Sequence, residues 1–353
     1  MKILISGVCG FVGSHLARYL IESHEDIAIV GLDNLMRSGS ETNRVWLRRL
    51  GVQLFHGDTR MASDLETLPL TDWVIDAAAQ PSVLSGRDGK TSSRQLIEHN
   101  LLGTINVLEY CRSARAGLIL LSTSRVYSIA ALAQLPMRVE ASAFCLDEGQ
   151  PWPAAVSLAG VKEGFSTEAP VSLYGATKLA SELLAQEYAG AFGIPVWINR
   201  CGVLAGAGQF GTSEQGIFSY WLCAHSTRRP LKYLGFGGQG FQVRDALHPR
   251  DLARIVDFQL RSGEPGQLLN VSGGQENSMS LRQLTDWCDQ RFGLHQPIAD
   301  DSERPYDIPW LVLDSSKALA ATAWKPQISL IQILEEISEH AVRHPEWLTW
   351  CGV

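Results

Sequence analysis

Tyr174 and Lys178 stand four residues apart in a segment, residues 173–182, that has helical character. On a helix this spacing places both side chains on one face. A nearby ammonium group favours the tyrosinate anion and lowers a phenol pKa that is ordinarily about 10. The pair therefore predicts a base that can take a proton near neutral pH. Such a pair also occurs by chance on a solvated helix, so the prediction depends on residues elsewhere in the chain.

The composition is that of an ordinary globular protein. The 353 residues, 45% of them hydrophobic and 19% charged, suffice for one large domain or two lobes. A formal net charge of −7 disfavours nucleic acid or a membrane surface as the main partner, although a local basic pocket for phosphate remains compatible with it. The seven cysteines are scattered without a C-x-x-C pair, so we expect no disulfide framework, no metal site and a cytoplasmic location. No apolar run reaches the roughly 18 residues of a membrane span.

A glycine-rich turn follows the first apolar segment. Residues 2–6 have a strand pattern and lead directly into Gly7, Gly10 and Gly13, after which a helical pattern runs to about residue 23. Glycines at this spacing allow a tight turn and a close approach of backbone to a pyrophosphate, while the free N–H groups of the helix start attract an anion. The segment predicts a dinucleotide-binding loop.

Asp33 ends the next apolar strand, residues 27–32, about twenty residues beyond the glycine turn. A carboxylate there would accept a hydrogen bond from the ribose 2′-hydroxyl and repel a 2′-phosphate. The spacing therefore predicts NAD rather than NADP. On its own, Asp33 could equally be a turn residue at a strand end.

Strand and helix patterns then alternate, with strands at residues 53–56, 73–77 and 118–122 and helices between them, notably at residues 93–112. Such alternation predicts an α/β fold with a Rossmann-type, doubly wound parallel sheet that binds ligands at the carboxyl ends of its strands. Asp58 follows one strand end and is expected near the adenine, with a loop cap as the alternative. We expect three nearby arginines to be solvated: Arg37, Arg44 and Arg60.

Taken together, Gly7-x-x-Gly10-x-x-Gly13, Asp33, Thr123 and Tyr174-x-x-x-Lys178 resemble the extended short-chain dehydrogenase/reductase family over almost the whole chain. The resemblance implies that Thr123 holds the reacting sugar hydroxyl and that Tyr174 is the acid/base. It also implies that Lys178 binds the nicotinamide ribose and lowers the pKa of Tyr174. The predicted cofactor contacts are Gly7, Gly10, Phe11, Val12, Gly13, Asp33, Asn34, Asp58, Thr59, Ala78, Gln80, Tyr174, Lys178 and Cys201.

The residues after Thr123 bear on the reaction. In the 4,6-dehydratases of this family an Asp-Glu pair follows the threonine and serves the loss of water, whereas this chain has Ser124 and Arg125. Elimination chemistry would lack its acid and base. We therefore expect hydride chemistry without dehydration.

A long segment, residues 128–172, precedes the predicted catalytic tyrosine. Loops of this length are uncommon and often lie over sites, although a surface excursion is the alternative. Its run of residues 160–165 is similar to a lid segment in one subgroup of the family, the CDP-paratose/CDP-tyvelose 2-epimerases.

The last third of the chain carries further similarity to that subgroup, in the Q-F-x-x-x-x-Q-G order from Gln209 to Gly216 and in residues 242–248 and 270–281. By this resemblance Arg244 binds a substrate diphosphate, which suits a guanidinium; a structural pair with Asp245 or Asp251 is the alternative. Many relatives carry an Asn where this chain has Val203, which leaves one edge of the site in doubt. The predicted substrate contacts are Ser82, Ser124, Arg125, Gln209, Gln215, Arg244 and Arg304.

These patterns predict an NAD-binding Rossmann domain, residues 1–199 with about 243–270, and a nucleotide-sugar lobe, residues 200–242 and 271–353. The favoured function is a CDP-sugar 2-epimerase with tightly bound NAD that oxidises its substrate transiently to a 2-keto sugar. A UDP-hexose 4-epimerase shares every cofactor residue and is the main alternative, followed by another nucleotide-sugar dehydratase or reductase and by a catalytically silent nucleotide-binding module. The resemblance further implies a homodimer.

Overall fold

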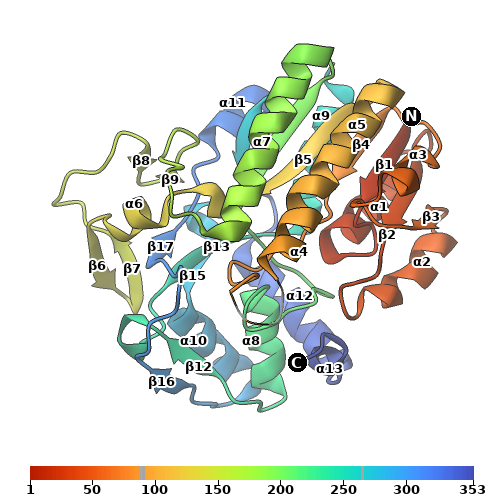
Figure 1. Cartoon of the computed structure of the whole chain (residues 1–353). Helices are drawn as coiled ribbons and strands as arrows, with labels where there is room; N and C mark the ends of the chain where they lie inside the picture. Colours follow the sequence, from red (N-terminus) through yellow and green to blue (C-terminus); the bar gives the residue numbers. More distant parts are fainter. Residues whose placement is uncertain (88, 90–91, 264–265) are drawn as a thin grey trace.

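A seven-stranded parallel sheet forms the centre of the computed structural model, which describes residues 1–87, 89, 92–263 and 266–353 (Figure 1). The strand order is β14-β10-β5-β4-β1-β2-β3, and every neighbouring pair is parallel. The predicted Rossmann-type fold is therefore confirmed. The strands are β1 (Lys2–Ser6), β2 (Ala28–Asp33), β3 (Gln53–His56), β4 (Trp73–Asp76), β5 (Gly117–Thr123), β10 (Val196–Cys201) and β14 (Leu268–Val271).

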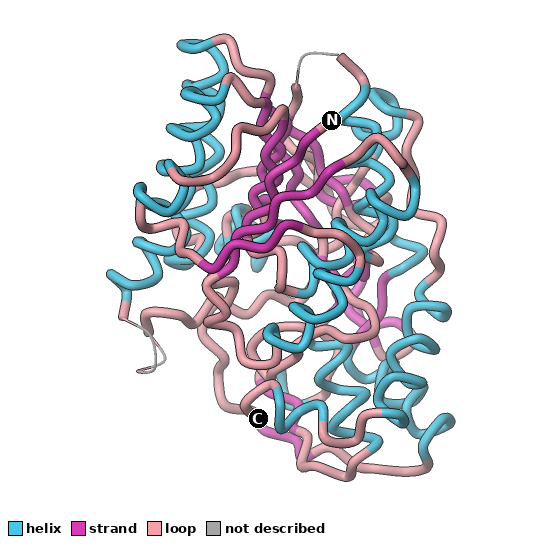
Figure 2. The backbone as a smooth tube through the Cα atoms, turned by 90° about the vertical axis from the view of Figure 1, so that its right-hand side faces the viewer, coloured by secondary structure: helices cyan, strands magenta, loops and turns pink. Residues whose placement is uncertain are grey.

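Helices cover both faces of this sheet, as Figure 2 shows. Ile3 and Ile5 point into one hydrophobic core and Leu4 points into the other, so the strand is apolar at every core position. The first face carries α1 (Phe11–Ser23), α2 (Asn43–Arg49), α9 (Pro249–Arg261) and α11 (Ser316–Thr322). The second carries α3 (Ala62–Glu66), α4 (Ser93–Ile97), α5 (Gly103–Ala114) and α7 (Ser172–Phe192).

A smaller lobe lies beyond the carboxyl ends of the large sheet. It holds a four-stranded sheet and a helical core in which α8 packs against α10 and α12, and capping boxes at Ser280 and Ser329 start the last two. Its elements are β11 (Val203–Leu204), α8 (Ile217–Ser226), β12 (Lys232–Leu234), β13 (Val243–Leu247), β15 (Ser278–Ser280), α10 (Leu281–Phe292), β16 (Ile298–Asp300), β17 (Trp310–Leu311), α12 (Leu330–Arg343) and α13 (Trp347–Trp350).

The chain passes between the two lobes more than once. Strand β13 belongs to the smaller sheet, the next helix, α9, packs on α1, and β14 then closes the edge of the large sheet beside β10. Of the residues that we predict to return to the Rossmann domain, about 243–270, β13 lies in the smaller sheet and β14 in the large one. The boundaries of the two lobes stay a prediction.

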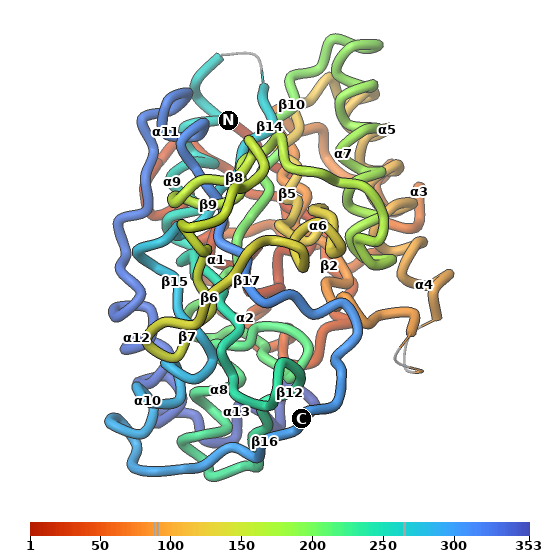
Figure 3. Tube along the Cα trace, turned by 90° about the vertical axis from the view of Figure 1, so that its left-hand side faces the viewer, coloured from red at the N-terminus to blue at the C-terminus, as the bar shows by residue number. Residues whose placement is uncertain are grey.

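Residues 128–172 fold against the outside of the smaller sheet (Figure 3). Phe165 is 4% exposed and packs edge-on against Tyr127, and the Val161 N–H donates to the Val312 carbonyl at 2.8 Å. The segment therefore shares a hydrophobic core with β13, β17 and the residues that follow β17. It contains α6 (Ile129–Ala133), β6 (Met137–Glu140), β7 (Ala143–Leu146), β8 (Val156–Ser157) and β9 (Gly160–Val161). In the described part of the chain, no helix has the length and apolarity needed to cross a membrane.

Candidate active site

A cavity of about 920 Å³ lies where the carboxyl ends of the central strands face the smaller lobe. Its size is near the upper end of ligand pockets, roughly 300–1,000 Å³. Both lobes contribute walls, as a two-ligand site requires. The predicted site residues that line it are Gly7, Gly10, Phe11, Val12, Gly13, Asp33, Asn34, Thr59, Ala78, Gln80, Thr123, Ser124, Arg125, Tyr174, Cys201, Gln209, Gln215, Arg244 and Arg304.

The glycine turn has the geometry that a pyrophosphate needs. A Cβ added to Gly13 would lie 2.4 Å from the Gly7 carbonyl oxygen, so only glycine lets α1 start this close to the turn. Gly10, at the N-terminus of α1, provides no side-chain cap, which leaves the first N–H groups of the helix available to an anion. The residues present therefore fit the pyrophosphate of a dinucleotide.

Asp33 lies at the end of β2 and lines the cavity. Its carboxylate accepts the N–H of Cys9 and the N–H of Leu35, each at 2.8 Å, which fixes its orientation beside the glycine turn. Burial raises the pKa of Asp33, and these donors oppose that shift. A carboxylate has about four lone-pair sites, so it can still accept a ribose hydroxyl.

Asp58 is not among the described residues that line the cavity, contrary to the prediction. Its carboxylate is engaged by Arg60, at 2.6 and 3.0 Å, and by the Asn34 amide at 3.0 Å. Burial alone would raise its pKa, but these hydrogen bonds hold the pKa of Asp58 well below its usual range. Arg60 is therefore a structural partner rather than a solvated residue, and the neighbouring Thr59 reaches the cavity instead.

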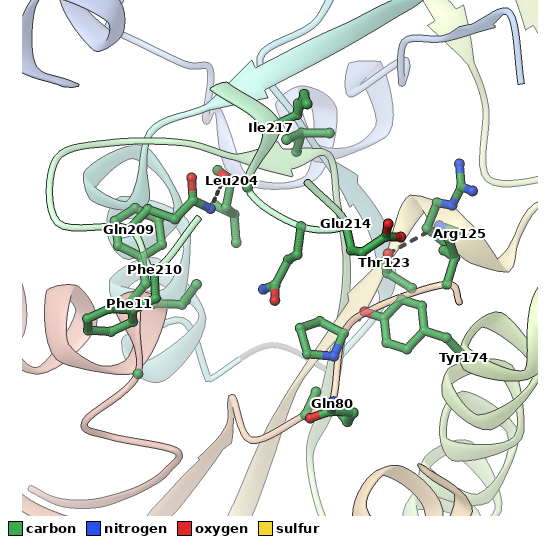
Figure 4. Close-up of a pocket in the computed structure, with 18 of the residues that line it drawn as sticks. Phe11, Gln80, Thr123, Arg125, Tyr174, Leu204, Gln209, Phe210, Glu214 and Ile217 are labelled. Atoms are coloured by element: carbon green, nitrogen blue, oxygen red, sulfur yellow. Dashed lines mark hydrogen bonds between the residues drawn. The ribbon is translucent and has the colours of Figure 1, made fainter. Parts of the chain in front are cut away.

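Thr123 and Tyr174 come together where β5 ends and α7 begins (Figure 4). The approach of α7 to the turn after β5 is very close, because a Cβ on Gly175 would lie 2.3 Å from the Arg125 carbonyl oxygen. The first turn of the helix is fixed by the Ser172 hydroxyl, which accepts the Gly175 N–H at 3.1 Å. The Thr123 and Tyr174 side chains thus share the wall of the cavity, as predicted from the sequence.

The electrostatics of Tyr174 differ from the expectation. Burial raises the pKa of Tyr174 to about 12, while a hydrogen bond with Thr123 and the positive charge of Arg125 act in the opposite direction. Lys178 is 2% exposed and is not among the described residues lining the cavity. Burial lowers the pKa of Lys178, and the nearby acids Asp76 and Glu182 oppose that shift. The positive charge of Arg125 favours the tyrosinate, and the predicted action of Lys178 on Tyr174 stays a prediction.

Asn100, for which no sequence pattern predicted a role in the site, joins α7 to the loop that follows β4. Its amide oxygen accepts the Gln80 N–H at 2.7 Å, and its amide nitrogen donates to the Gln80 carbonyl at 3.0 Å and to the Thr177 hydroxyl at 3.3 Å. It lies in a π-helical turn, Glu98–Leu102, a feature that often marks functional sites. A buried asparagine inside a helix was the signal that could have indicated it.

A buried ion pair joins α7 to β10 behind the cavity. The Arg200 guanidinium donates to Glu182 at 3.0 and 2.7 Å, with side chains 6% and 1% exposed, and the Ser122 hydroxyl also donates to Glu182. Ser122 precedes Thr123 on β5, so this network connects three of the elements that carry the site. Val203, which stands where many relatives carry an Asn, lines the cavity.

Arginines gather at the other end of the cavity. Arg244 donates to Asp307 at 3.0 Å and to the Ile308 carbonyl at 2.8 Å, and Arg125 donates to the Tyr306 carbonyl at 2.7 Å. Arg304 lies 3.5 Å from a carboxylate oxygen of Glu214. The predicted alternative, a pair of Arg244 with Asp245 or Asp251, is wrong. Asp245 accepts hydrogen bonds from the Ser272 hydroxyl and the Leu313 N–H. Asp251 accepts from Arg254 and from the backbone of residues 327–328. Burial lowers the pKa of Arg125 to about 10, and the charge of Arg244 adds to that shift.

Two of the predicted substrate residues, Ser82 and Gln209, already have hydrogen-bond partners within the protein. The Ser82 hydroxyl accepts the Leu84 N–H at 3.2 Å within a turn, and Ser82 is not among the described residues that line the cavity. The amide of Gln209 is also occupied, since it donates to the Leu204 carbonyl at 2.7 Å and accepts from Ser219 at 2.9 Å. Gln209 therefore shapes its loop, and both Gln209 and Gln215 line the cavity.

The lid expectation for residues 160–165 is wrong. None of the residues 128–172 lines the cavity among those described, and Glu163 instead accepts the Asn270 N–H at 2.7 Å. The expectation that Arg37 is solvated is also wrong, because Arg37 lines the cavity and donates to the Phe210 carbonyl. Other lining residues that the sequence did not single out are Ser213, Glu214, Lys232, Tyr306 and Asp307.

A comparison with models of known protein families identifies the family of this chain. The model of the NAD dependent epimerase/dehydratase family matches residues 3–272, and the chain belongs to this family. The protein is thus an NAD-dependent enzyme, and the glycine turn and Asp33 fit that cofactor.

Particular relatives narrow the comparison. The CDP-paratose 2-epimerase of Salmonella typhi is 30% identical over 93% of this chain and 96% of that protein. The UDP-glucuronate 4-epimerase of Thermodesulfobacterium geofontis is 26% identical over 93% of this chain and 92% of that protein. The structure of the Thermotoga maritima UDP-glucose 4-epimerase with UDP-glucose superimposes with a TM-score of 0.78 at 23% identity, covering 97% of this chain and 99% of that one. The last likeness concerns the fold alone.

Proposed function

We propose that the protein is an NAD-dependent nucleotide-sugar epimerase that inverts C2 of a CDP-sugar. Support comes above all from one arrangement: Thr123 and Tyr174 share a wall of the cavity, and the acid–base pair of a dehydratase is replaced after them by Ser124 and Arg125. The site can then take a hydroxyl proton but has no group there to expel water. The likeness to a CDP-paratose 2-epimerase favours C2 and a CDP-sugar.

In this mechanism the Thr123 hydroxyl holds the hydroxyl of the reacting carbon, and Tyr174 takes its proton. NAD, held by the glycine turn and Asp33, would serve as the acceptor and then as the donor of the hydride. Between these steps the 2-keto ring turns over, and Tyr174 returns its proton to the new alcohol, so that no net oxidation remains. Lys178 holds the nicotinamide ribose, and Arg125 favours the tyrosinate through its charge.

Arg244 and Arg304 are proposed to bind the substrate diphosphate. Both line the cavity, and guanidinium groups suit phosphate oxygens. Asp307 pairs with Arg244, and Glu214 pairs with Arg304. A diphosphate would then compete with these carboxylates.

Further proposals follow from family membership. NAD stays bound through many turnovers, since an epimerase must give back the hydride that it removes. A homodimer would form through residues 100–112 and 174–188, whose helices leave Leu102 and Leu183 39% and 59% exposed. Size-exclusion chromatography with light scattering would detect the dimer.

The experiment is incubation of purified protein with CDP-paratose, followed by NMR at C2. Inversion at C2 without loss of water is the expected result. In deuterated water, exchange at neighbouring carbons without inversion at C2 would point to a different reaction. Mass spectrometry of the released cofactor would show whether NAD copurifies.

A UDP-sugar 4-epimerase is the second candidate. It is favoured by the 26% identity to a UDP-glucuronate 4-epimerase along nearly the whole chain. The two differ in which ring carbon faces the nicotinamide, while the cofactor residues are shared. A panel of CDP- and UDP-sugars, with products assigned at C2 and C4, separates them; a silent nucleotide-binding module would turn over none of them.

A further inference from the structure

Three segments that are distant in the sequence meet at one edge of the cavity. They are residues 37–39, which follow the ribose-binding Asp33, residues 209–211, which begin the opposite wall, and residues 347–352 at the C-terminus. We call this meeting point the C-terminal junction. Figure 4 shows Phe210 beside Phe11 on the wall opposite Tyr174.

Phe210 is the centre of the junction. Its ring is 3% exposed and stacks on Trp347 with centroids 5.4 Å apart and an interplanar angle of 18°. The same ring occupies the space that a side chain on Gly39 would need, since a Cβ there would lie 2.8 Å from it. With a φ of +89°, Gly39 also has a backbone conformation that favours glycine.

Backbone hydrogen bonds fix the same loop from two sides. The Trp347 Nε1–H donates to the Gln209 carbonyl at 2.8 Å, and Arg37 donates to the Phe210 carbonyl. The C-terminal segment is itself tied down, because Arg229 donates to the Val353 carbonyl at 2.7 Å and to the Thr349 hydroxyl at 2.9 Å. The loop therefore cannot leave residues 37–39 without breaking the Arg37 bond, while the Trp347 and Arg229 bonds hold Phe210 and the C-terminal segment in position within the smaller lobe.

Both loops joined in this way belong to the cavity wall. Arg37, Ser38 and Phe210 line it, and so does Cys351 from the C-terminal segment. At its other end the same loop contacts the glycine turn at Phe11. A Cβ added to Gly206 would lie 3.3 Å from the Cζ atom of the Phe11 ring. The loop that starts the substrate wall is thus fastened to the cofactor lobe at two points.

We propose that the C-terminal junction is a clasp that retains NAD. Release of the cofactor requires the loop of residues 206–216 to move away from the loop of residues 33–40, and Phe210 with Trp347 opposes that movement. Trp347 acts as a positioning residue, since it is not among the described residues that line the cavity. This inference rests on the proposed epimerase function, in which NAD must not exchange between the two hydride transfers.

Exchange of bound NAD tests the clasp. Purified protein is mixed with excess deuterium-labelled NAD, and the labelled fraction of protein-bound cofactor is followed by mass spectrometry. Trp347→Phe keeps an aromatic ring but loses the bond to Gln209, and we expect its exchange to be about 10-fold faster, the effect of roughly one hydrogen bond. Gly39→Ala, which pushes against Phe210, should also accelerate exchange and provides a second variant if Trp347→Phe does not fold.

Trp324→Phe is the matched control. Trp324 is as buried as Trp347, each being 7% exposed, and it donates a similar bond to the Asp251 carbonyl at 2.9 Å, but it lies in the core between α9 and α11, away from the junction. Both Trp variants should lower the melting temperature, whereas only Trp347→Phe should exchange NAD faster than the wild type.

Equal exchange in the two Trp variants would overturn the clasp, and so would a wild-type protein that is purified without NAD. The proposed reaction is judged separately. A protein that shows the expected exchange pattern but does not invert any CDP-sugar would support the clasp and contradict the 2-epimerase.

Discussion

Arg200→Met should destabilise the protein strongly while leaving its surface unchanged. The guanidinium contacts both oxygens of Glu182, at 3.0 and 2.7 Å, and neither side chain is more than 6% exposed. Removing one partner leaves a buried carboxylate without its counter-charge, which costs about 3–5 kcal/mol. This loss of unfolding free energy should exceed the loss caused by removing one partner of an exposed ion pair.

This cost can be expressed as a melting temperature. With an unfolding entropy of about 2.1 cal/mol/K per residue, a chain of 353 residues loses roughly 1.4 °C per kcal/mol, so the expected shift is about 4–7 °C. Scanning calorimetry or the near-ultraviolet circular dichroism signal would measure it. Turnover should fall as well, because Glu182 lies on α7 with Tyr174 and also accepts from Ser122, the neighbour of Thr123.

Arg282→Met is the control, because Arg282 and Asp286 form a pair at 3.3 Å with side chains 48% and 51% exposed. Exposed pairs contribute roughly 0–1 kcal/mol, so the melting temperature should move by about 1 °C or less. The double variant Glu182→Leu with Arg200→Met should regain much of the loss. A shift for Arg200→Met no larger than that for Arg282→Met would refute the assignment of a stabilising buried pair.

Three further predictions concern the site. Tyr174→Phe should lower turnover at least about 100-fold, as expected for loss of an acid/base, with the NAD content measured by mass spectrometry unchanged; turnover near that of the wild type would contradict the assignment of Tyr174. Arg125→Met removes a positive charge that lowers the pKa of Tyr174, so the rising limb of turnover against pH should move to higher pH, and an unmoved limb would show that this charge does not act on the base. Gly13→Ala places a Cβ 2.4 Å from the Gly7 carbonyl oxygen and should abolish copurification of NAD, and full retention would mean that the turn can widen.

Much of the Rossmann sheet could be predicted from the sequence because its strands are buried on both faces. A strand such as Lys2–Ser6 must then be apolar at nearly every position, and a glycine turn and a carboxylate at a fixed distance follow from the local path of the chain. Tyr174 could also be predicted, but from the resemblance of its Tyr-x-x-x-Lys motif to a known family, because residues 124–171 separate β5 from α7 in the chain.

The remaining errors concern contacts between distant parts of the chain. Arg37 was expected to be solvated, but its carbonyl partner belongs to Phe210, 173 residues later. For Arg244 the alternative to diphosphate binding was a pair with Asp245 or Asp251, whereas its partner is Asp307. Local spacing also could not reveal that Phe165 packs on Tyr127. A segment similar to a lid therefore belongs to a core that it shares with the smaller sheet.

The way in which the chain returns to the large sheet has a consequence for biosynthesis. A nascent chain of 201 residues contains six of the seven strands, but β14 and the core residues of α9 are still to be made. The wall of the cavity is complete only when Cys351 has been synthesised. A cofactor can therefore be fully enclosed only after nearly the whole polypeptide has left the ribosome. We expect a truncated N-terminal half to expose its unfinished sheet edge to chaperones and not to retain NAD.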